Sequence, residues 1–326
     1  MFSTVVSLVV LSVLIVIVAV RLTRVADRIA ETAGLSRGFV GVLLLAVATS
    51  LPELVTSLAA VLLCGSPGLA FGNVFGSNVV NLSFIGLMDL LVVGSIFLTA
   101  SERHLRTARF VAVFTVFCMA LIGMGRWLGP AAFIPSKIAS LVILAAYVAV
   151  MRSDPQEAAS SQLHSLGAGR PRVPWPEFAA CAAGILVVGL LLTRACDDFA
   201  RQSGLGQTFV GTLILALVTS IPELVVSIEA VRLGSIDMAL GNIVGSNLFN
   251  LTILAVCDLT LVRGSLYAAP QAVSSLPAAL GSLGMVVLTA AALRARPAGT
   301  ILGRLSWPSV ALILAYLASN LATYLS

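Results

Sequence analysis

The sequence predicts an all-α polytopic membrane protein with ten transmembrane helices arranged as two inverted five-helix repeats. Of its 326 residues, 59% are hydrophobic and only 10% are charged, and the mean hydropathy is +1.07. Ten apolar runs approach or exceed the roughly 20 residues that cross a bilayer. The two halves also carry the same polar motifs. The net charge of +5 does not indicate a nucleic-acid partner, because the basic residues lie in short loops between apolar runs.

The apolar runs divide evenly about a polar linker, residues 152–177, which contains Pro and Gly and lacks apolar periodicity. The expected spans lie near residues 3–21, 38–63, 69–98, 108–125 and 133–151 in the first half, 1–151, and near 178–194, 208–232, 236–262, 272–293 and 307–325 in the second half, 178–326. The first run has no basic flank or cleavage site, so we expect a retained helix rather than a signal peptide. Residues 21–37 are either an amphipathic surface helix or the charged end of that first span.

An internal duplication relates the two halves. Residues 39–58 match 209–228 at 13 of 20 positions, and residues 72–82 match 241–251 at 7 of 11. The duplicated regions, called alpha-repeats here, cover about 38–98 and 208–262. Because each half holds an odd number of spans, the second half must enter the membrane from the opposite side. Inverted repeats are typical of secondary transporters, so we expect a transporter and not an enzyme.

The basic residues predict the orientation in the cell membrane. One side carries 14 of the 19 lysines and arginines, and the other side carries Arg126, Lys137, Arg194, Arg201 and Arg263. Because cytoplasmic loops are enriched in basic residues, both termini are expected outside the cytoplasm.

The second and seventh spans each carry one small, oxygen-rich helix face around a Thr-Ser-x-Pro-Glu motif. The matching positions are Ala46, Thr49, Ser50, Pro52 and Glu53 in the first repeat and Ala216, Thr219, Ser220, Pro222 and Glu223 in the second. Proline removes a helix hydrogen bond, so both helices should bend or open there. Carboxylate, hydroxyl and carbonyl oxygens suit calcium or sodium, whereas the absence of nearby His and Cys disfavours zinc and copper.

The third and eighth spans add a polar stripe at four-residue steps. Its members are Asn73, Ser77 and Asn81, repeated as Asn242, Ser246 and Asn250. Beside the stripe, Gly72 with Gly76, and Gly241 with Gly245, should allow close helix packing. Asn78 and Asn247 lie one residue off the stripe, so Asn81 and Asn250 are favoured as ligands. Two facing buried glutamates need a divalent cation, two monovalent cations or protons to compensate them.

Several other polar residues have plainer interpretations. We favour structural pairing near the membrane surface for Asp89 and Asp258, with a proton or gating role as the alternative. Glu229 should pair with Arg232 at a spacing of three residues. His104 and His164 fall in polar loops and should be solvated. The five cysteines show no CxxC spacing and are expected to be small core residues.

These paired motifs resemble the calcium/cation antiporter superfamily, and specifically short prokaryotic sodium/calcium exchangers. The resemblance implies that Glu53 and Glu223 are central ligands beside Thr49 and Thr219, and that Asn81 and Asn250 complete the middle. It implies monovalent sites lined by Ser50, Ser77, Ser220, Ser246 and the carbonyls of Ala46 and Ala216. It also implies that the first and sixth spans slide across a rigid core.

The chain departs from that family in three places. Ala48 and Val218 replace a glycine before Thr-Ser, Asn250 stands where many exchangers have an aspartate, and Asp89 and Asp258 stand where apolar residues or glycine are expected. The site therefore offers two carboxylates rather than three.

The sequence thus predicts an antiporter that exchanges calcium, or another divalent cation, for sodium by alternating access. Ca²⁺ and Na⁺ (or H⁺) would be bound transiently, with no resident cofactor, and the expected partners are the lipid bilayer and inorganic cations. A monomer is compatible with the sequence. The alternatives are proton- or potassium-coupled exchange, a cation channel, and a non-transporting scaffold or sensor of the same fold.

Overall fold

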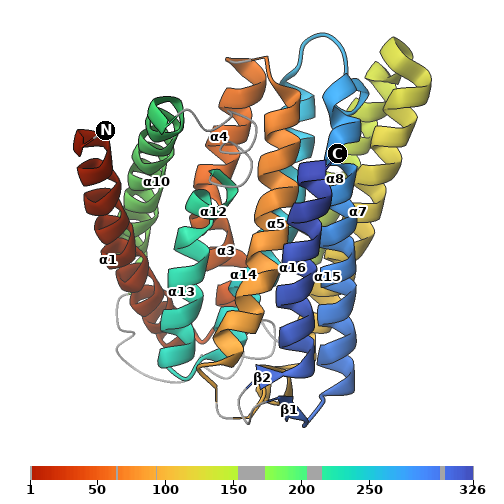
Figure 1. The fold of residues 1–326 in the computed structure, drawn as a ribbon. Helices are drawn as coiled ribbons and strands as arrows, with labels where there is room; N and C mark the ends of the chain where they lie inside the picture. The colour runs from red at the N-terminus through yellow and green to blue at the C-terminus, as the bar shows by residue number, and fades with distance from the viewer. Residues whose placement is uncertain are drawn as a thin grey trace.

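A computed structural model describes residues 2–63, 65–92, 94–152, 173–203, 215–301 and 305–325. Within these ranges nearly every element is a helix, and the strands are two-residue segments, β1 (Thr300–Ile301) and β2 (Leu305–Ser306), that pair antiparallel. Figure 1 shows the helices side by side, with both chain termini toward one end and the β1–β2 ribbon at the other. Below, the end opposite the termini is called the basic end.

The first half contains five spans, of which the second is broken into short helical pieces. Its elements are α1 (Phe2–Ala33), α2 (Arg37–Val40), the π-helix η1 (Gly41–Leu45), α3 (Ala46–Thr49), α4 (Leu51–Leu62), α5 (Pro67–Asp89), α6 (Ile96–Thr99), α7 (Arg103–Leu128), the 3₁₀ turn η2 (Gly129–Ala132) and α8 (Phe133–Arg152). Because α1 is one continuous helix, most of residues 21–37 form the charged end of the first span and not a separate surface helix.

The second half repeats this order. Its elements are α10 (Trp175–Ser203), α12 (Leu215–Thr219), α13 (Ile221–Arg232), α14 (Ile236–Thr260), the 3₁₀ turns η4 (Leu266–Ala268) and η5 (Pro270–Ser275), α15 (Leu276–Ala295) and α16 (Trp307–Leu325). Residues 175–177, predicted to be linker, are already helical. Most of the linker, with His164, and residues 208–214 of the second alpha-repeat lie outside the described residues.

Judged by length and composition, six of the described helices could each cross a membrane, or seven if the bent pair Arg37–Thr49 and Leu51–Leu62 is one span. That count takes Arg103–Arg152 as one helix of 50 residues. Side-chain contacts show that this stretch consists of two helices, α7 and α8, that run in opposite directions. His104 lies 3.0 Å from Asp237 at the start of α14, and Lys137 lies 3.4 Å from Asp258 near its end. Tyr147 then returns to Phe249, so α8 runs back along α14 and residues 103–152 cross twice.

The helices α5 and α14 form the centre of the molecule and run in opposite directions. They are the most buried spans, with 78% and 89% of their apolar windows inside the protein. Gly68 at the start of α5 lies against Gln271 of η5, in the segment that follows the end of α14. At the other end, the Ser101 amide beyond α5 donates to Asp237 at the start of α14, at 2.7 Å. The duplication seen in the sequence is therefore inverted in space.

Glycines allow α14 to approach the broken second span closely. A Cβ atom on Gly245 would lie 2.5 Å from the carbonyl oxygen of Val42, and one on Gly241 would lie 2.7 Å from that of Gly38. Both contacts are to backbone, which cannot move aside cheaply. The glycines predicted for packing in the second repeat therefore have that role. Gly72 and Gly76 are partly exposed, and the segment related to residues 38–42 by the duplication lies outside the described residues.

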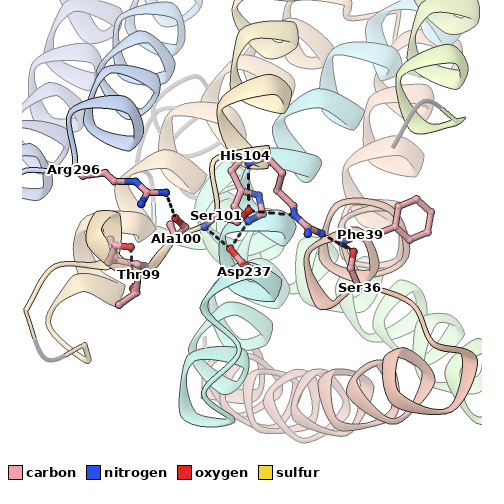
Figure 2. Close-up of polar contacts among 10 residues, drawn as sticks. Ser36, Phe39, Thr99, Ala100, Ser101, His104, Asp237 and Arg296 are labelled. Atoms are coloured by element: carbon pink, nitrogen blue, oxygen red, sulfur yellow. Dashed lines mark hydrogen bonds and ion pairs between the residues drawn. The ribbon is translucent and has the colours of Figure 1, made fainter. Parts of the chain in front are cut away.

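The prediction that His104 is a solvated loop residue is wrong. Its side chain is fully buried in the first turn of α7, and its Nε2 lies 3.0 Å from an Asp237 oxygen (Figure 2). Nearby, Arg103 donates to Ser36 Oγ at 2.6 Å, and the same oxygen accepts the Phe39 amide. These contacts join the N-terminal ends of α2, α7 and α14, which lie far apart in the sequence.

Asp89 and Asp258 fasten the segments that follow α5 and α14. Asp89 accepts the amide of Ile96 at 2.7 Å, and its other oxygen accepts both the amide and the hydroxyl of Ser306. Asp258 accepts the Leu266 amide at 2.8 Å and pairs with Lys137. The related contacts to Ile96 and Leu266 show the duplication again at opposite ends of the molecule.

Ion pairs connect α1 to its neighbours. Glu229 of α13 pairs with Arg24 of α1 at 2.9 Å, so the predicted pairing of Glu229 with Arg232 is wrong. The reason is that α1 packs against α13 and brings Arg24 to the buried carboxylate. Arg21 and Arg28 both reach Glu177 of α10, at 3.1 and 2.6 Å.

Candidate cation-binding site

Both Thr-Ser-x-Pro-Glu motifs interrupt their helices at the serine. Ser50 has φ −88° and ψ 8°, and Ser220 has φ −88° and ψ 3°, outside the helical range. The pieces on either side of Ser50 differ in direction by 41°. Pro52 and Pro222 stand in the first turn of the helix that follows, where the missing N–H is not needed. The predicted breaks are therefore present in both repeats.

Each break places a glutamate in the first turn of a new helix. Glu53 begins α4 and Glu223 begins α13, and both side chains are fully buried. The N-terminal end of a helix carries partial positive charge, which favours a carboxylate there. This local gain is small beside the cost of burying two carboxylates, so the pair still needs compensating charge.

The two repeats exchange hydrogen bonds at these carboxylates. Ser50 donates to Glu223 at 2.8 Å, and Ser220 donates to Glu53 at 3.4 Å. Ser246 lies 3.5 Å from Glu223 and also donates to the carbonyl of Ala46, at 3.4 Å. The site is thus shared, with the serine of each repeat bonded to the glutamate of the other.

Asn73 and Asn242 brace the half-helices. The Asn73 amide donates to the Glu53 carbonyl at 3.2 Å and to Ser57 at 3.0 Å. Asn242 makes the matching bonds to Glu223 and Ser227 at the same distances. Each asparagine side chain therefore fixes the backbone of a glutamate to α5 or α14, the helix that carries the asparagine.

Among the residues that the structure describes, several buried oxygens at this centre have no hydrogen-bond donor. They are Glu53 Oε2, Asn73 Oδ1, Ser77 Oγ, Asn81 Oδ1, Glu223 Oε2 and Asn250 Oδ1. Buried polar atoms without partners are rare because each costs free energy. All six are oxygens, the atom type that calcium and sodium bind. Within the described ranges no group of three or more His, Cys, Asp and Glu gathers, so this centre offers two carboxylates together with neutral oxygens.

The remaining predicted residues fall into two groups. Thr49 bonds the carbonyls of Leu45 and Ala46, and Thr219 bonds that of Ala216, beside the breaks. Asp89 and Asp258, in contrast, contact the chain at the two ends and not this centre. Sequence reasoning assigned no role to Asn78 and Asn247, which join α5 to α14. Their recurrence in both copies of the Gly-Asn-x-x-Gly-Ser-Asn motif was the available signal.

A family model described as sodium/calcium exchanger protein matches residues 3–152 and 175–325. The chain is 29% identical over 246 residues to the inner membrane protein YrbG of Escherichia coli, covering 74% of each chain. It is 27% identical over 263 residues to the sodium/calcium exchanger MaX1 of Methanosarcina acetivorans, covering 70% of this chain and 75% of that one.

A shorter region is 44% identical over 76 residues to the human sodium/potassium/calcium exchanger 2, covering 23% of this chain and 12% of that protein. A structure of the sodium-calcium exchanger NCX_Mj soaked with 2.5 mM Na⁺ and 10 mM Sr²⁺ superposes with a TM-score of 0.72 at 21% identity, covering 97% of both chains. That similarity shows the fold. With the family match across both halves, the chain belongs to the sodium/calcium exchanger protein family.

Proposed function

We propose that the protein is a secondary active antiporter that exchanges calcium, or another divalent cation, for sodium across the cell membrane by alternating access. One observation carries the proposal. Two buried glutamates and four neutral side chains, drawn from both inverted repeats, present oxygens without hydrogen-bond donors at the helix breaks. Membership in the exchanger family and the similarity to the sodium/calcium exchanger MaX1 support the choice of ions.

Within this site the divalent cation binds between Glu53 and Glu223. Thr49, Thr219, Asn81 and Asn250 complete its surroundings. Flanking monovalent ions use Ser50, Ser77, Ser220 and Ser246 together with the carbonyls of Ala46 and Ala216. All of these ions are cargo. The protein carries out no bond-breaking chemistry and needs no resident cofactor.

The charge of the site explains why ion movements are coupled. Two ionised carboxylates balance one divalent cation or two monovalent cations. An empty site would carry uncompensated buried charge, which is costly inside a membrane. The helix pair α1 and α10 therefore slides across the core only when the glutamates are occupied, and each crossing exchanges one kind of cargo for the other.

Because Asn250 is neutral, the site is also compatible with a second coupling ion. With two carboxylates rather than three, the site holds less negative charge for sodium to neutralise, and protons or potassium could drive the return step. Proton or potassium coupling is therefore the second candidate for the same divalent transport.

Isotopic calcium uptake into proteoliposomes tests the proposal, with sodium, potassium and pH gradients imposed one at a time. Uptake should require an outward sodium gradient and fall at least about tenfold in Glu53→Gln and in Glu223→Gln, because ligand charge sets divalent affinity. Glu102→Gln, whose side chain is 77% exposed, is the control and should retain uptake.

Other results would reject the proposal in defined ways. Uptake driven only by a proton or potassium gradient would identify the second candidate. Calcium conduction without a counter-ion would indicate a channel, and no movement under any gradient would indicate a scaffold. Normal uptake in both glutamine variants would refute the site.

A further inference from the structure

We infer that Asn78 and Asn247 are positioning residues, each of which turns the carbonyl oxygen of an asparagine in the opposite repeat toward the bound cation. Asn78 acts through Asn250, and Asn247 acts through Asn81. The inference rests on the proposed function, because it takes Asn81 and Asn250 to be ligands. It adds two residues that lie off the polar stripe and do not themselves offer an oxygen to the site.

Two reciprocal bonds to backbone fix the first pair of amides. Asn78 Nδ2 donates to the carbonyl of Asn247 at 3.3 Å, and Asn247 Nδ2 donates to the carbonyl of Asn78 at 3.1 Å. A backbone carbonyl can only accept a hydrogen bond. The nitrogen of each amide must therefore face the other helix, and neither amide can be reversed without setting two oxygens against each other.

The orientation of the second pair follows from the first. With their nitrogens committed, Asn78 and Asn247 have only oxygens left to present. Asn250 Nδ2 donates to Asn78 Oδ1 at 3.0 Å, and Asn81 Nδ2 donates to Asn247 Oδ1 at 3.1 Å. Asn81 and Asn250 must therefore turn their nitrogens inward to this network and their oxygens away from it. Those two oxygens are the buried Oδ1 atoms that have no donor.

Burial makes this control effective. All four asparagine side chains are fully buried, so water is not available to stabilise a reversed amide. An Asn250 amide released from Asn78 could rotate and present its N–H groups to the site. An N–H group repels a cation, whereas the carbonyl oxygen binds it. The network thus sets the chemical character of the ligand without touching the ion.

The bonding pattern predicts which substitutions act together. Asn78 and Asn81 share helix α5 but have no bond to each other in this network, whereas Asn78 and Asn250 lie on different helices and are bonded. A double-mutant cycle measures such coupling directly. The effects of Asn78→Ala and Asn250→Ala should overlap, and those of Asn78→Ala and Asn81→Ala should multiply.

The experiment measures KM and kcat for sodium-driven calcium uptake in proteoliposomes. Asn78→Ala should raise KM for calcium about tenfold, the size expected for losing a residue that orients a metal ligand, with kcat changed less than twofold. Adding Asn250→Ala should then raise KM less than twofold further. The calcium-induced rise in melting temperature in detergent gives a second measure of affinity, independent of how much protein is reconstituted.

Asn320→Ala in α16 is the matched control, because the Asn320 amide bonds the Tyr316 carbonyl of its own helix at 2.8 Å. It should leave KM unchanged. If Asn78→Ala lowers only kcat or yield, or if its effect multiplies with that of Asn250→Ala, the inference is wrong although the proposed function stands. If Asn81→Ala and Asn250→Ala themselves leave KM unchanged, the ligand assignment in the proposed function is wrong.

Discussion

Asp89 and the two site glutamates are all buried, but they differ in how their oxygens are used. Both oxygens of Asp89 accept hydrogen bonds, from Ile96 and Ser306. Glu53 and Glu223 each keep one oxygen without a donor. A buried carboxylate whose oxygens both accept hydrogen bonds has a structural role. A carboxylate oxygen without a donor is available to a ligand.

Replacing Asp89 should therefore affect stability and not ion affinity. In Asp89→Asn the amide nitrogen must face a backbone N–H at Ile96 or Ser306, because both carboxylate oxygens accept one. We expect the free energy of unfolding to fall by about 2 kcal/mol, the usual cost of leaving a buried donor unpaired. Thermal unfolding in detergent measures it. Glu31→Gln, at an exposed ion pair, should change little. A raised KM for calcium would instead indicate that Asp89 contributes to the site.

The sequence predicted which residues share a helix face better than it predicted the partners of buried polar residues. Four-residue spacing placed Asn73, Ser77 and Asn81 on one face because that spacing depends only on local helix geometry. The partners of Glu229 and His104 come from helices distant in the sequence, and loop composition carries no information about them. The asparagine network was missed for the same reason, since its bonds cross between the two repeats.

At the scale of elements, the breaks were predictable and their packing was only partly so. Proline explains why the second and seventh spans divide. The π-helix η1 had no signal in the sequence. It lies where Gly241 and Gly245 let α14 press against the backbone of residues 38–42. The paired glycines predicted close approach, but not which helix would approach.

Gly245→Ala should disrupt this contact. Its Cβ would lie 2.5 Å from the Val42 carbonyl oxygen, so α14 and η1 must move apart. We expect a lower melting temperature and a loss of calcium uptake, because Ser246 follows Gly245 in α14 and Ala46 directly follows η1. Gly284→Ala is the control. Its Cβ would meet nothing within 4 Å, and helix propensity favours alanine by up to about 1 kcal/mol, so stability should hold or rise. Equal melting temperatures for the two variants would contradict this account.

The arginines of α1 differ in the carboxylate that is left without a partner when the arginine is replaced. Arg24→Gln leaves Glu229, whose side chain is 6% exposed, without its cation. Arg21→Gln leaves Glu177, which is 31% exposed and still bonded to Arg28. We therefore expect a clearly larger drop in melting temperature for Arg24→Gln, since an unpaired buried charge is costly. The reverse order would show that Arg24 does not anchor α1 to α13.

At the scale of the whole molecule, duplication and charge determine the architecture. The fold class followed from counting apolar runs and comparing the two halves, which require no knowledge of contacts. Figure 1 shows both termini at one end, as an even number of crossings requires. The basic residues near the C-terminal ends of α1 and α15 lie toward the opposite end, where these helices finish.

This charge distribution predicts the orientation in the cell. The predicted topology assigns 14 of the 19 lysines and arginines to the side of the basic end, so that end should face the cytoplasm. An epitope tag after Ser326 should therefore be accessible to antibody or protease from outside the cytoplasmic membrane in intact spheroplasts. A tag inserted in the linker, at residue 165, should become accessible only after the cells are opened. The opposite result would invert the topology.

The crossed bonds of Ser50 with Glu223 and Ser220 with Glu53 bear on how the protein is made. During synthesis the first five-helix half enters the membrane before Ser220 and Asn247 exist. At that stage Glu53 has no hydroxyl from the second repeat, and Asn78 has no carbonyl to bind. The proposed cation site is therefore complete only when the last-made half has packed against the first. A protein made of one half would need two copies inserted in opposite orientations to assemble the same crossed bonds.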